Sequence, residues 1–203
     1  LWAWGSNDSG QLGLGDTVIR YYPVQVGSDT NWSKIEHSGA SNFGIKTDGT
    51  LYAWGNNYYG QLGDGTTTDR STPYKLTWTV TNPCKFGCFS GYAYTAGFLI
   101  TTTGQLYVSG NSTVSGYGNG LDNTSWQYYM PWGASNTVKL VRSSQSDGPA
   151  VGSQYYSRTA VLLDNGDLYM WGSDYSAAGS WGTGYTGDIT PGSSTLHPYK
   201  CLT

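Results

Sequence analysis

Carboxylates in glycine-rich segments are the side chains of this sequence with the clearest chemical potential. Asp16, Asp64 and Asp69 lie within or just after "GQLGLGD" and "GQLGDGTTTD". Carboxylate and backbone oxygens on one loop can bind calcium, but the spacing here fits no calcium-loop template. Asp side chains in such loops also accept hydrogen bonds from turn amides. We therefore expect turn-forming aspartates and no metal site.

The other reactive side chains are few and scattered. His37 and His197 have no Ser or Cys nucleophile motif beside them. Cys84 and Cys88, in "CKFGC", lack redox and zinc spacing. They are interpreted as small buried hydrophobic residues, with a disulfide between them as the alternative. No nucleotide-binding loop or metalloprotease motif occurs, so the sequence predicts a protein that is not an enzyme and has no cofactor.

Tyrosine, with 18 copies, is the residue type best suited to binding. It forms four doublets, at Tyr21-Tyr22, Tyr58-Tyr59, Tyr128-Tyr129 and Tyr155-Tyr156. In a strand, one tyrosine of each doublet is expected to face outward. Tyrosine suits protein interfaces and sugar stacking, but it also covers flat sheet faces, and both interpretations stay open. The loop position of Tyr58-Tyr59 favours binding.

A longer interval separates Lys139 from Gly166 than separates Lys34 from Gly49, and it contains "SSQSDGPAVGSQYY". Loops that lengthen in one repeat are where specificity is usually placed. Together with the tyrosine doublets, this segment gives a candidate contact surface made of Tyr58, Tyr59, Tyr128, Tyr129, Ser143, Gln145, Asp147, Tyr155 and Tyr156.

Internal repeats must position these residues. Leu1–Thr17 and Leu51–Thr67 share 11 identities over 17 positions, and weaker copies begin at Leu106 and Leu168. The successive periods are 50, 55 and 62 residues. The chain is thus one β-domain of repeats 1–50, 51–105 and 106–167 and a partial repeat 168–203.

Each repeat is expected to hold about four short strands. Asp48-Gly49 and Asn165-Gly166 predict hairpins with two-residue type I′ turns. The segments 51–54 and 168–171 are apolar on both faces, so both faces must be covered. Radially packed four-stranded sheets meet this requirement, and a period near fifty residues is in the propeller range. The sequence predicts an all-β fold, a β-propeller with just under four blades.

Composition excludes some classes of function. The chain has 30 Gly but only 11% charged residues, a net charge of −3 and a single glutamate, Glu36. Scattered basic residues and an acidic pI near 5.1 argue against nucleic-acid binding. No apolar run reaches membrane-spanning length, and no helical apolar stripe occurs.

The repeated pattern "W-G-x-N-x-x-G-Q-L-G-x-G", preceded by "D-G-x-L-Y", resembles the repeat of the regulator of chromosome condensation family. The resemblance implies a seven-bladed β-propeller, of which this chain would be part, or several chains would share one ring. The third copy is the weakest, because Ser109 replaces the tryptophan. Where family repeats carry a histidine before the hairpin, this chain has Asn42, Gly97 and Thr159.

The resemblance also implies an exchange factor for a small GTPase, but the acidic pI and the lack of a basic arm argue against it. The uncharged, Gly-, Ser-, Asn- and Tyr-rich composition resembles bacterial surface and phage structural proteins. The prediction is a non-enzymatic structural or adhesive module of a virion or cell surface, extracellular, within a larger chain or oligomer. It would bind protein subunits or glycan through loops and exposed aromatics. The alternative is a guanine-nucleotide exchange factor or a cytoplasmic regulatory scaffold.

Overall fold

The computed structural model describes residues 1–77, 84–90, 96–110, 123–129, 137–145, 157–173 and 194–200. Strands, turns and irregular loops make up all of these residues, so the prediction of an all-β chain is confirmed. In this part of the chain, nothing helical of membrane-spanning length and hydrophobicity is found.

The strands form three four-stranded antiparallel sheets and one two-stranded sheet, each in sequence order. The small sheet pairs β1 (Trp2–Gly5) with β2 (Arg20–Gln25). The first four-stranded sheet holds β3 (Trp32–Ser38), β4 (Ser41–Lys46), β5 (Leu51–Gly55) and β6 (Arg70–Lys75). The second holds β7 (Cys84–Ser90), β8 (Ala96–Thr101), β9 (Leu106–Gly110) and β10 (Asn123–Tyr128). The third holds β11 (Val138–Gln145), β12 (Ser157–Leu163), β13 (Leu168–Ser173) and β14 (Ser194–Lys200).

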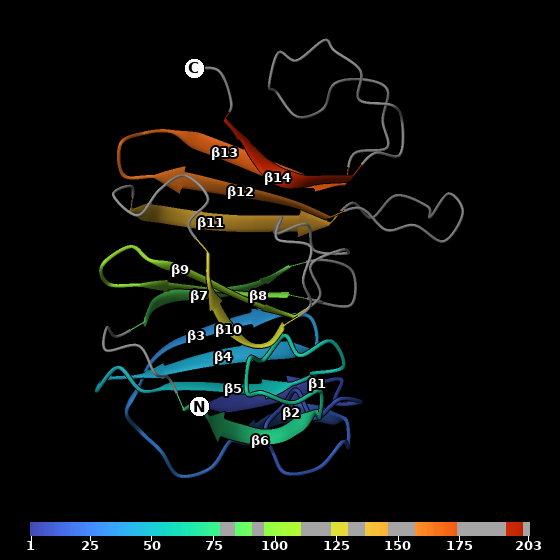
Figure 1. The fold of residues 1–203 in the computed structure, drawn as a ribbon. Coiled ribbons are helices and arrows are strands. Elements are labelled where there is room, and N and C mark those ends of the chain that lie inside the picture. The colour runs from blue at the N-terminus through green and yellow to red at the C-terminus, as the bar shows by residue number, and fades with distance from the viewer. Residues whose placement is uncertain are drawn as a thin grey trace.

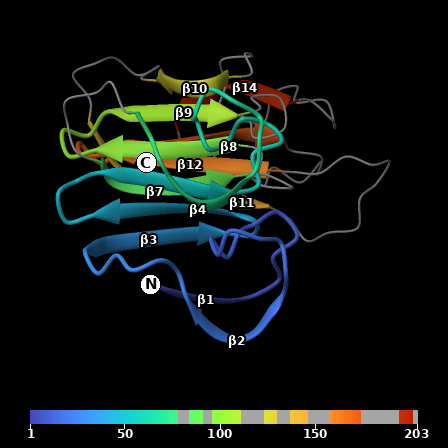
Figure 2. The ribbon, with the colours of Figure 1, turned by 90° about the horizontal axis from the view of Figure 1, so that it is seen from below.

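The sheets are blades that follow one another face to face (Figure 1). The first strands of the three four-stranded sheets lie next to one another: β7 contacts both β3 and β11. Seen from below, the β1–β2 hairpin lies at the end of this series, next to β3 (Figure 2). The predicted β-propeller with just under four blades is confirmed. Each four-stranded sheet joins the end of one sequence repeat to the start of the next, since β4 lies before residue 51 and β5 begins there.

The hydrophobic core lies between neighbouring sheets. One cluster, including Phe43, Leu51 and Leu99, joins the first and second four-stranded sheets. Another, including Phe98 and Val161, joins the second and third. Strands β4 and β8 are buried along their whole length. Residues 51–54 are buried except for the half-buried Tyr52, so the prediction of two covered faces is confirmed for this segment. In the second predicted segment, Leu168, Tyr169 and Met170 are half-buried.

The hairpin turns differ from the predicted two-residue type. Gly49 N donates to Lys46 O at 2.9 Å and Lys46 N donates to Thr50 O at 2.9 Å. Thr47 and Asp48 are therefore the central turn residues, and Gly49, with φ of 82°, follows them in the left-handed region. This is a three-residue hairpin loop. The turns at Gly104 and Gly166 repeat its hydrogen bonds and positive φ. The prediction of a type I′ turn was wrong because the glycine closes the turn and does not form its centre.

Pro23 and Pro73 lie in the outer strands β2 and β6, where a missing N–H removes no bond to an inner neighbour and discourages further pairing.

Cys84 and Cys88 both lie on β7. Residues four apart on one strand are separated by roughly 13 Å, well beyond the Cα spacing of a disulfide. The alternative of a Cys84–Cys88 disulfide was therefore wrong.

Candidate functional site

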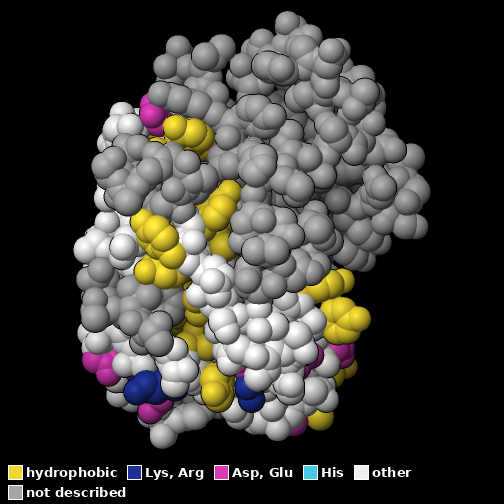
Figure 3. All heavy atoms as spheres, in the orientation of Figure 1, with side chains coloured by type: hydrophobic (Ala, Val, Ile, Leu, Met, Phe, Trp, Pro, Cys, Tyr) yellow, Lys and Arg dark blue, Asp and Glu magenta, His cyan; other side chains and the backbone are white. Residues whose placement is uncertain are grey.

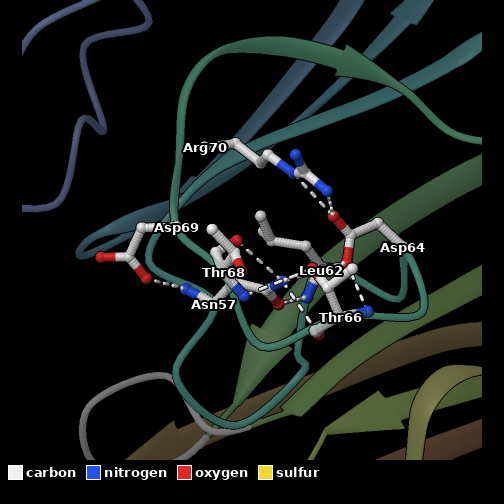
Figure 4. A network of polar contacts seen from close by, with 7 residues as sticks. All are labelled: Asn57, Leu62, Asp64, Thr66, Thr68, Asp69 and Arg70. Carbon is white, nitrogen blue, oxygen red and sulfur yellow. Dashed lines mark hydrogen bonds and ion pairs between the residues drawn. The ribbon is translucent and has the colours of Figure 1, made fainter.

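The loop between β5 and β6 is built around Asn57, a fully buried side chain (Figure 4). Asn57 Oδ1 accepts from Leu62 N at 2.9 Å. Its Nδ2 donates to Asp64 Oδ1 at 3.0 Å and to the carbonyls of Thr66 and Thr68 at 3.1 Å each. The amide thus satisfies oxygens that the turning backbone points inward, and it fixes the shape of the loop.

Asp64 is the second centre of this loop. Its side chain is 0% exposed, and Oδ2 accepts from Arg70 Nε at 2.7 Å. Oδ1 accepts from the amide and the hydroxyl of Thr66 at 2.9 and 2.7 Å. Asp69 accepts from Asn57 N at 2.7 Å. These carboxylates bind turn donors, as predicted, and among the described residues no group of three or more His, Cys, Asp or Glu is placed to hold a metal.

The pKa of Asp64 lies below its ordinary value of 3.8. Burial raises it, but hydrogen bonds from the Thr66 hydroxyl, Arg70 and the Thr66 amide lower it by more. A carboxyl with a lowered pKa stabilises the fold above its ordinary pKa, and this stabilisation disappears as the pH falls through the lowered value.

We therefore predict that the free energy of unfolding decreases as the pH falls below about 4. Urea unfolding of wild type and Asp64→Asn between about pH 6 and pH 3 measures this. The variant is less stable at neutral pH. Its free energy of unfolding falls less steeply with decreasing pH, because it lacks the carboxyl whose pKa is lowered. An equal decrease in the free energy of unfolding of both proteins at acid pH would show that Asp64 does not contribute to the pH dependence.

The same loop fastens its blade to the next one. Gly65 N donates to Thr124 O of β10 at 2.8 Å, and Ser109 Oγ donates to Gln61 O at 2.9 Å. At Gly60 a Cβ would come within 2.8 Å of Thr124 Cα, and at Gly63 it would overlap the Trp126 ring. The glycines are needed for this close approach.

The first loop, residues 6–19, makes equivalent contacts with the first four-stranded sheet. Gly15 N donates to Ser71 O at 2.8 Å. Gln11 O accepts from Trp54 Nε1 at 3.1 Å and from Asn42 Nδ2 at 2.9 Å. Asn42 therefore provides a loop contact at a position where the family resemblance implies histidine.

An aromatic pair occupies the tip of the second loop. Tyr58 is 71% exposed, and its ring meets that of Tyr59 edge to face, with centroids 4.9 Å apart. Tyr59 N donates to Gln61 Oε1 at 3.0 Å, which ties the tip to the anchored base. Tyr59 is half-buried, so Tyr58 is the exposed ring of the pair. An exposed aromatic ring on a fixed loop loses little conformational entropy on binding.

The other predicted contact residues are distributed differently from expectation. Tyr128 is 47% exposed on β10, but Tyr129 is 8% exposed and packs in the core between two sheets, so its assignment to the surface was wrong. Ser143 and Gln145 lie on β11 opposite Thr159 and Ser157, so the prediction that a loop begins at Ser143 was wrong. Asp147, Tyr155 and Tyr156 lie outside the described residues.

The sequence interpretation missed an apolar surface on the first hairpin. Its large side chains are 46–78% exposed: Trp2, Trp4, Val18, Ile19, Tyr21 and Tyr22. Tyr21 and Tyr22 are both exposed, contrary to the expectation of one inward ring per doublet. In the view of Figure 3, hydrophobic side chains also reach the surface over the lower sheets, beside a few charged side chains of either sign.

These features define the class of the protein. It is a segment of a β-propeller whose blades are fastened by glycine-rich loops. Residues 1–42 and 48–96 match the model of the regulator of chromosome condensation (RCC1) repeat, so the chain carries divergent repeats of this family, as the sequence pattern predicted.

Solved structures show the same fold. Human WBSCR16 is 22% identical with a TM-score of 0.73, and Prp20p from Saccharomyces cerevisiae, studied for its binding to Gsp1p and histones, is 17% identical with a TM-score of 0.70. Yeast RCC1 (Prp20) bound to Kap60 is 15% identical with a TM-score of 0.68. All three cover 100% of this chain, which spans 48%, 46% and 44% of theirs. The chain therefore corresponds to about half the length of these propellers.

Proposed function

We propose that this chain is part of a non-enzymatic propeller that acts as a regulatory scaffold by binding another protein. The observation that carries the proposal is the exposed Tyr58 ring, which packs edge to face on the half-buried Tyr59 at the tip of a loop whose base is buried and hydrogen-bonded. Rigid, exposed tyrosines are typical anchors of protein interfaces. The similarity to Prp20p, which binds Gsp1p and histones, supports a protein as the ligand.

Two finer functions remain as alternatives within this proposal. Nucleotide exchange on a small GTPase is favoured by the similarity to Prp20p, and accelerated release of labelled GDP from purified Gsp1p would establish it. A structural or adhesive role on a virion or cell surface is suggested only by composition. Neither the repeat match nor the solved structures support it, and the partner Kap60 of yeast RCC1 favours the cytoplasmic alternative over an extracellular one.

The loop itself offers a matched variant for the test. Asp8 and Ser9 occupy the positions of Tyr58 and Tyr59 in the first loop. The double variant Tyr58→Asp with Tyr59→Ser therefore gives the second loop a tip that already folds in this chain. We expect unchanged thermal unfolding and a loss of partner binding of about tenfold or more.

Binding is measured first with purified Gsp1p and histones, and then by quantitative capture from extract on the immobilised chain. Wild type and the double variant are compared at equal loading. Equal retention of every captured protein by the two chains would contradict the proposal, because the tyrosine tip would then contribute nothing.

A further inference from the structure

Asn165 and Gly166 form the tip of the hairpin that joins β12 to β13 (Figure 1). Asp164, Asn165 and Gly166 are all exposed, and a Cβ at Gly166 would meet nothing within 4 Å. Asparagine is a thermolabile residue. Glycine after it is the most reactive arrangement, because no side chain shields the glycine nitrogen and its backbone adopts many conformations. The tip therefore combines a reactive pair of residues with open space around it.

The other asparagines of the described residues lack this combination, since none of them precedes a glycine. Asn31 is exposed but precedes Trp32, the first residue of β3. Asn57 is fully buried, and its amide is held by the loop. Asn119-Gly120 is a second pair of this kind and lies outside the described residues.

Hydrogen bonds hold the Asn165 side chain in the closed turn. Its Oδ1 accepts from Asp167 N at 2.9 Å, and its Nδ2 donates to Asp167 Oδ2 at 3.1 Å. Gly166 N donates to Leu163 O at 3.1 Å. Gly166 N must leave Leu163 O before it can attack the Asn165 amide, so the reaction requires the exposed tip to open.

The equivalent turn between β4 and β5 already carries the acid in place of the amide. Asp48 precedes Gly49 there, and Asp48 Oδ1 accepts from Thr50 N at 2.9 Å, as Asn165 Oδ1 accepts from Asp167 N. A carboxylate is thus compatible with this backbone. The two turns differ in the residue that follows the glycine, which is Thr50 in one and Asp167 in the other.

That difference makes conversion of Asn165 to an acid unfavourable for the turn. The acid has no Nδ2 donor, and it places an oxygen where Nδ2 now donates to Asp167 Oδ2. With Asp164, three carboxylates would then lie within residues 164–167, and like charges at this spacing repel. An isoaspartate would also lengthen the main chain within the three-residue loop.

The tip supports a contact between two blades. Asp164 N donates to Thr137 O at 2.9 Å, and Thr137 Oγ1 donates to the Asp164 carboxylate. The next residue, Val138, donates from its N to Gly104 O at 2.8 Å, in the β8–β9 turn. A Cβ at Gly104 would come within 2.5 Å of Thr137 Cβ. A change at the tip therefore reaches the second four-stranded sheet through Thr137.

We propose that Asn165 is a site of spontaneous deamidation in the folded chain, and that its conversion loosens this end of the third four-stranded sheet. Gly166 N attacks Asn165 Cγ, and the new N–C bond closes a succinimide ring. Nδ2 leaves as ammonia with the proton that Gly166 N gives up. Water then opens the ring on either side and yields an aspartate or an isoaspartate. The net change is the exchange of one ammonia for one water, and it adds one negative charge.

The proposal is independent of the proposed function, because the tip shares no residue with the loop that carries Tyr58 and Tyr59. Its test is therefore also independent of any binding partner. The purified chain is kept at neutral pH and physiological temperature for several weeks, in buffer and in urea. Samples are digested at intervals, and mass spectrometry follows the peptides that contain Asn165, Asn31 and Asn119 separately. Methylation by an isoaspartyl carboxyl methyltransferase identifies isoaspartate.

We expect the Asn165 peptide in buffer to gain about 1 Da and to convert at least about tenfold faster than the Asn31 peptide. Conversion in urea is several-fold faster still, because the bonds to Leu163 and Asp167 are absent there. The variant Asn165→Gln stays unconverted, since its longer side chain would have to close a larger ring.

The structural consequence is measured on the converted chain, which anion exchange separates through its additional negative charge. We expect the Asp164 and Gly166 amides of this fraction to exchange hydrogen about tenfold faster than those of the fresh chain. The Leu62 amide, bonded to Asn57 Oδ1 in another blade, is the control and keeps its exchange rate.

Three results would overturn the proposal. The first is an Asn165 that stays intact in buffer, whether or not urea converts it. The second is conversion at equal rates in buffer and urea, since the hydrogen bonds of the tip would then have no part in the reaction. The third is equal exchange of the Asp164 and Gly166 amides in the converted and fresh chains, since conversion would then leave the tip unchanged.

Discussion

Replacing Asn57 by Asp lowers the free energy of unfolding by about 3–5 kcal/mol, although the two side chains have the same shape. The substitution replaces the Nδ2 donor with an oxygen that faces Asp64 Oδ1 and the carbonyls of Thr66 and Thr68. A buried charge then has acceptors around it, and Asp64, which already binds Arg70, repels it.

Urea unfolding at neutral pH and near pH 4 checks this expectation. The introduced carboxyl has a raised pKa because of burial and the neighbouring carboxylate. Its penalty is therefore largest at neutral pH and decreases when it is protonated and can donate again. Asn31→Asp, at an exposed position, is the control for the added charge. A loss equal to that of the control would show that Asn57 does not organise the loop.

Replacing Gly55 by Ala is the second large effect, with an expected loss of about 3–5 kcal/mol. The alanine must adopt a positive φ, and its Cβ also overlaps the backbone carbonyl of Ala40, which cannot rotate away. Gly5→Ala has the same backbone strain but no overlap, so it should lose only about 1–2 kcal/mol. The pair separates strain from steric conflict at equivalent positions.

Chemical denaturation of the two variants under one condition gives the difference directly. If Gly5→Ala and Gly55→Ala lose the same free energy, the close approach of Ala40 to residue 55 contributes nothing to the loss.

The repeats, the antiparallel strands and the propeller class could be predicted from sequence, because periodicity and two-sided apolar strands depend on local order. The turn type could not. "DG" is compatible with two loop lengths, and the bond from Gly49 N to Lys46 O decides between them. In the same way, Tyr128 and Tyr129 both match a contact surface, but only packing between sheets shows that Tyr129 is buried.

The worn third copy shows how tertiary structure compensates for a substitution. Ser109 replaces the tryptophan of the repeat, yet it keeps the hydrogen bond to the preceding loop through Gln61 O. Trp126 of the neighbouring strand β10 takes the place against Gly63 that Trp54 has against Gly13. A comparison of aligned positions cannot find this exchange, because the ring comes from a different strand.

The candidate site also has a part that the sequence indicated and a part that only the structure shows. The sequence indicated Tyr58 and Tyr59 as binding residues because they lie in a glycine-rich loop, where they are not needed to cover the face of a sheet. Asn57 is the asparagine of the repeated W-G-x-N pattern and is matched by Asn7. The pattern did not show that its amide is buried and holds the loop. Only the convergence of oxygens of Asp64, Thr66 and Thr68 on its Nδ2 shows that role.

Trp4 and Trp54 give the simplest example of what sequence and tertiary structure each determine. They occupy the same place in two near-identical segments, and the sequence by itself determined that both lie on a strand followed by a glycine-rich loop. Only the tertiary structure decided that one is 3% exposed and the other 60%. Strand and turn follow from local backbone preferences, whereas burial depends on which other strands come to lie against the ring.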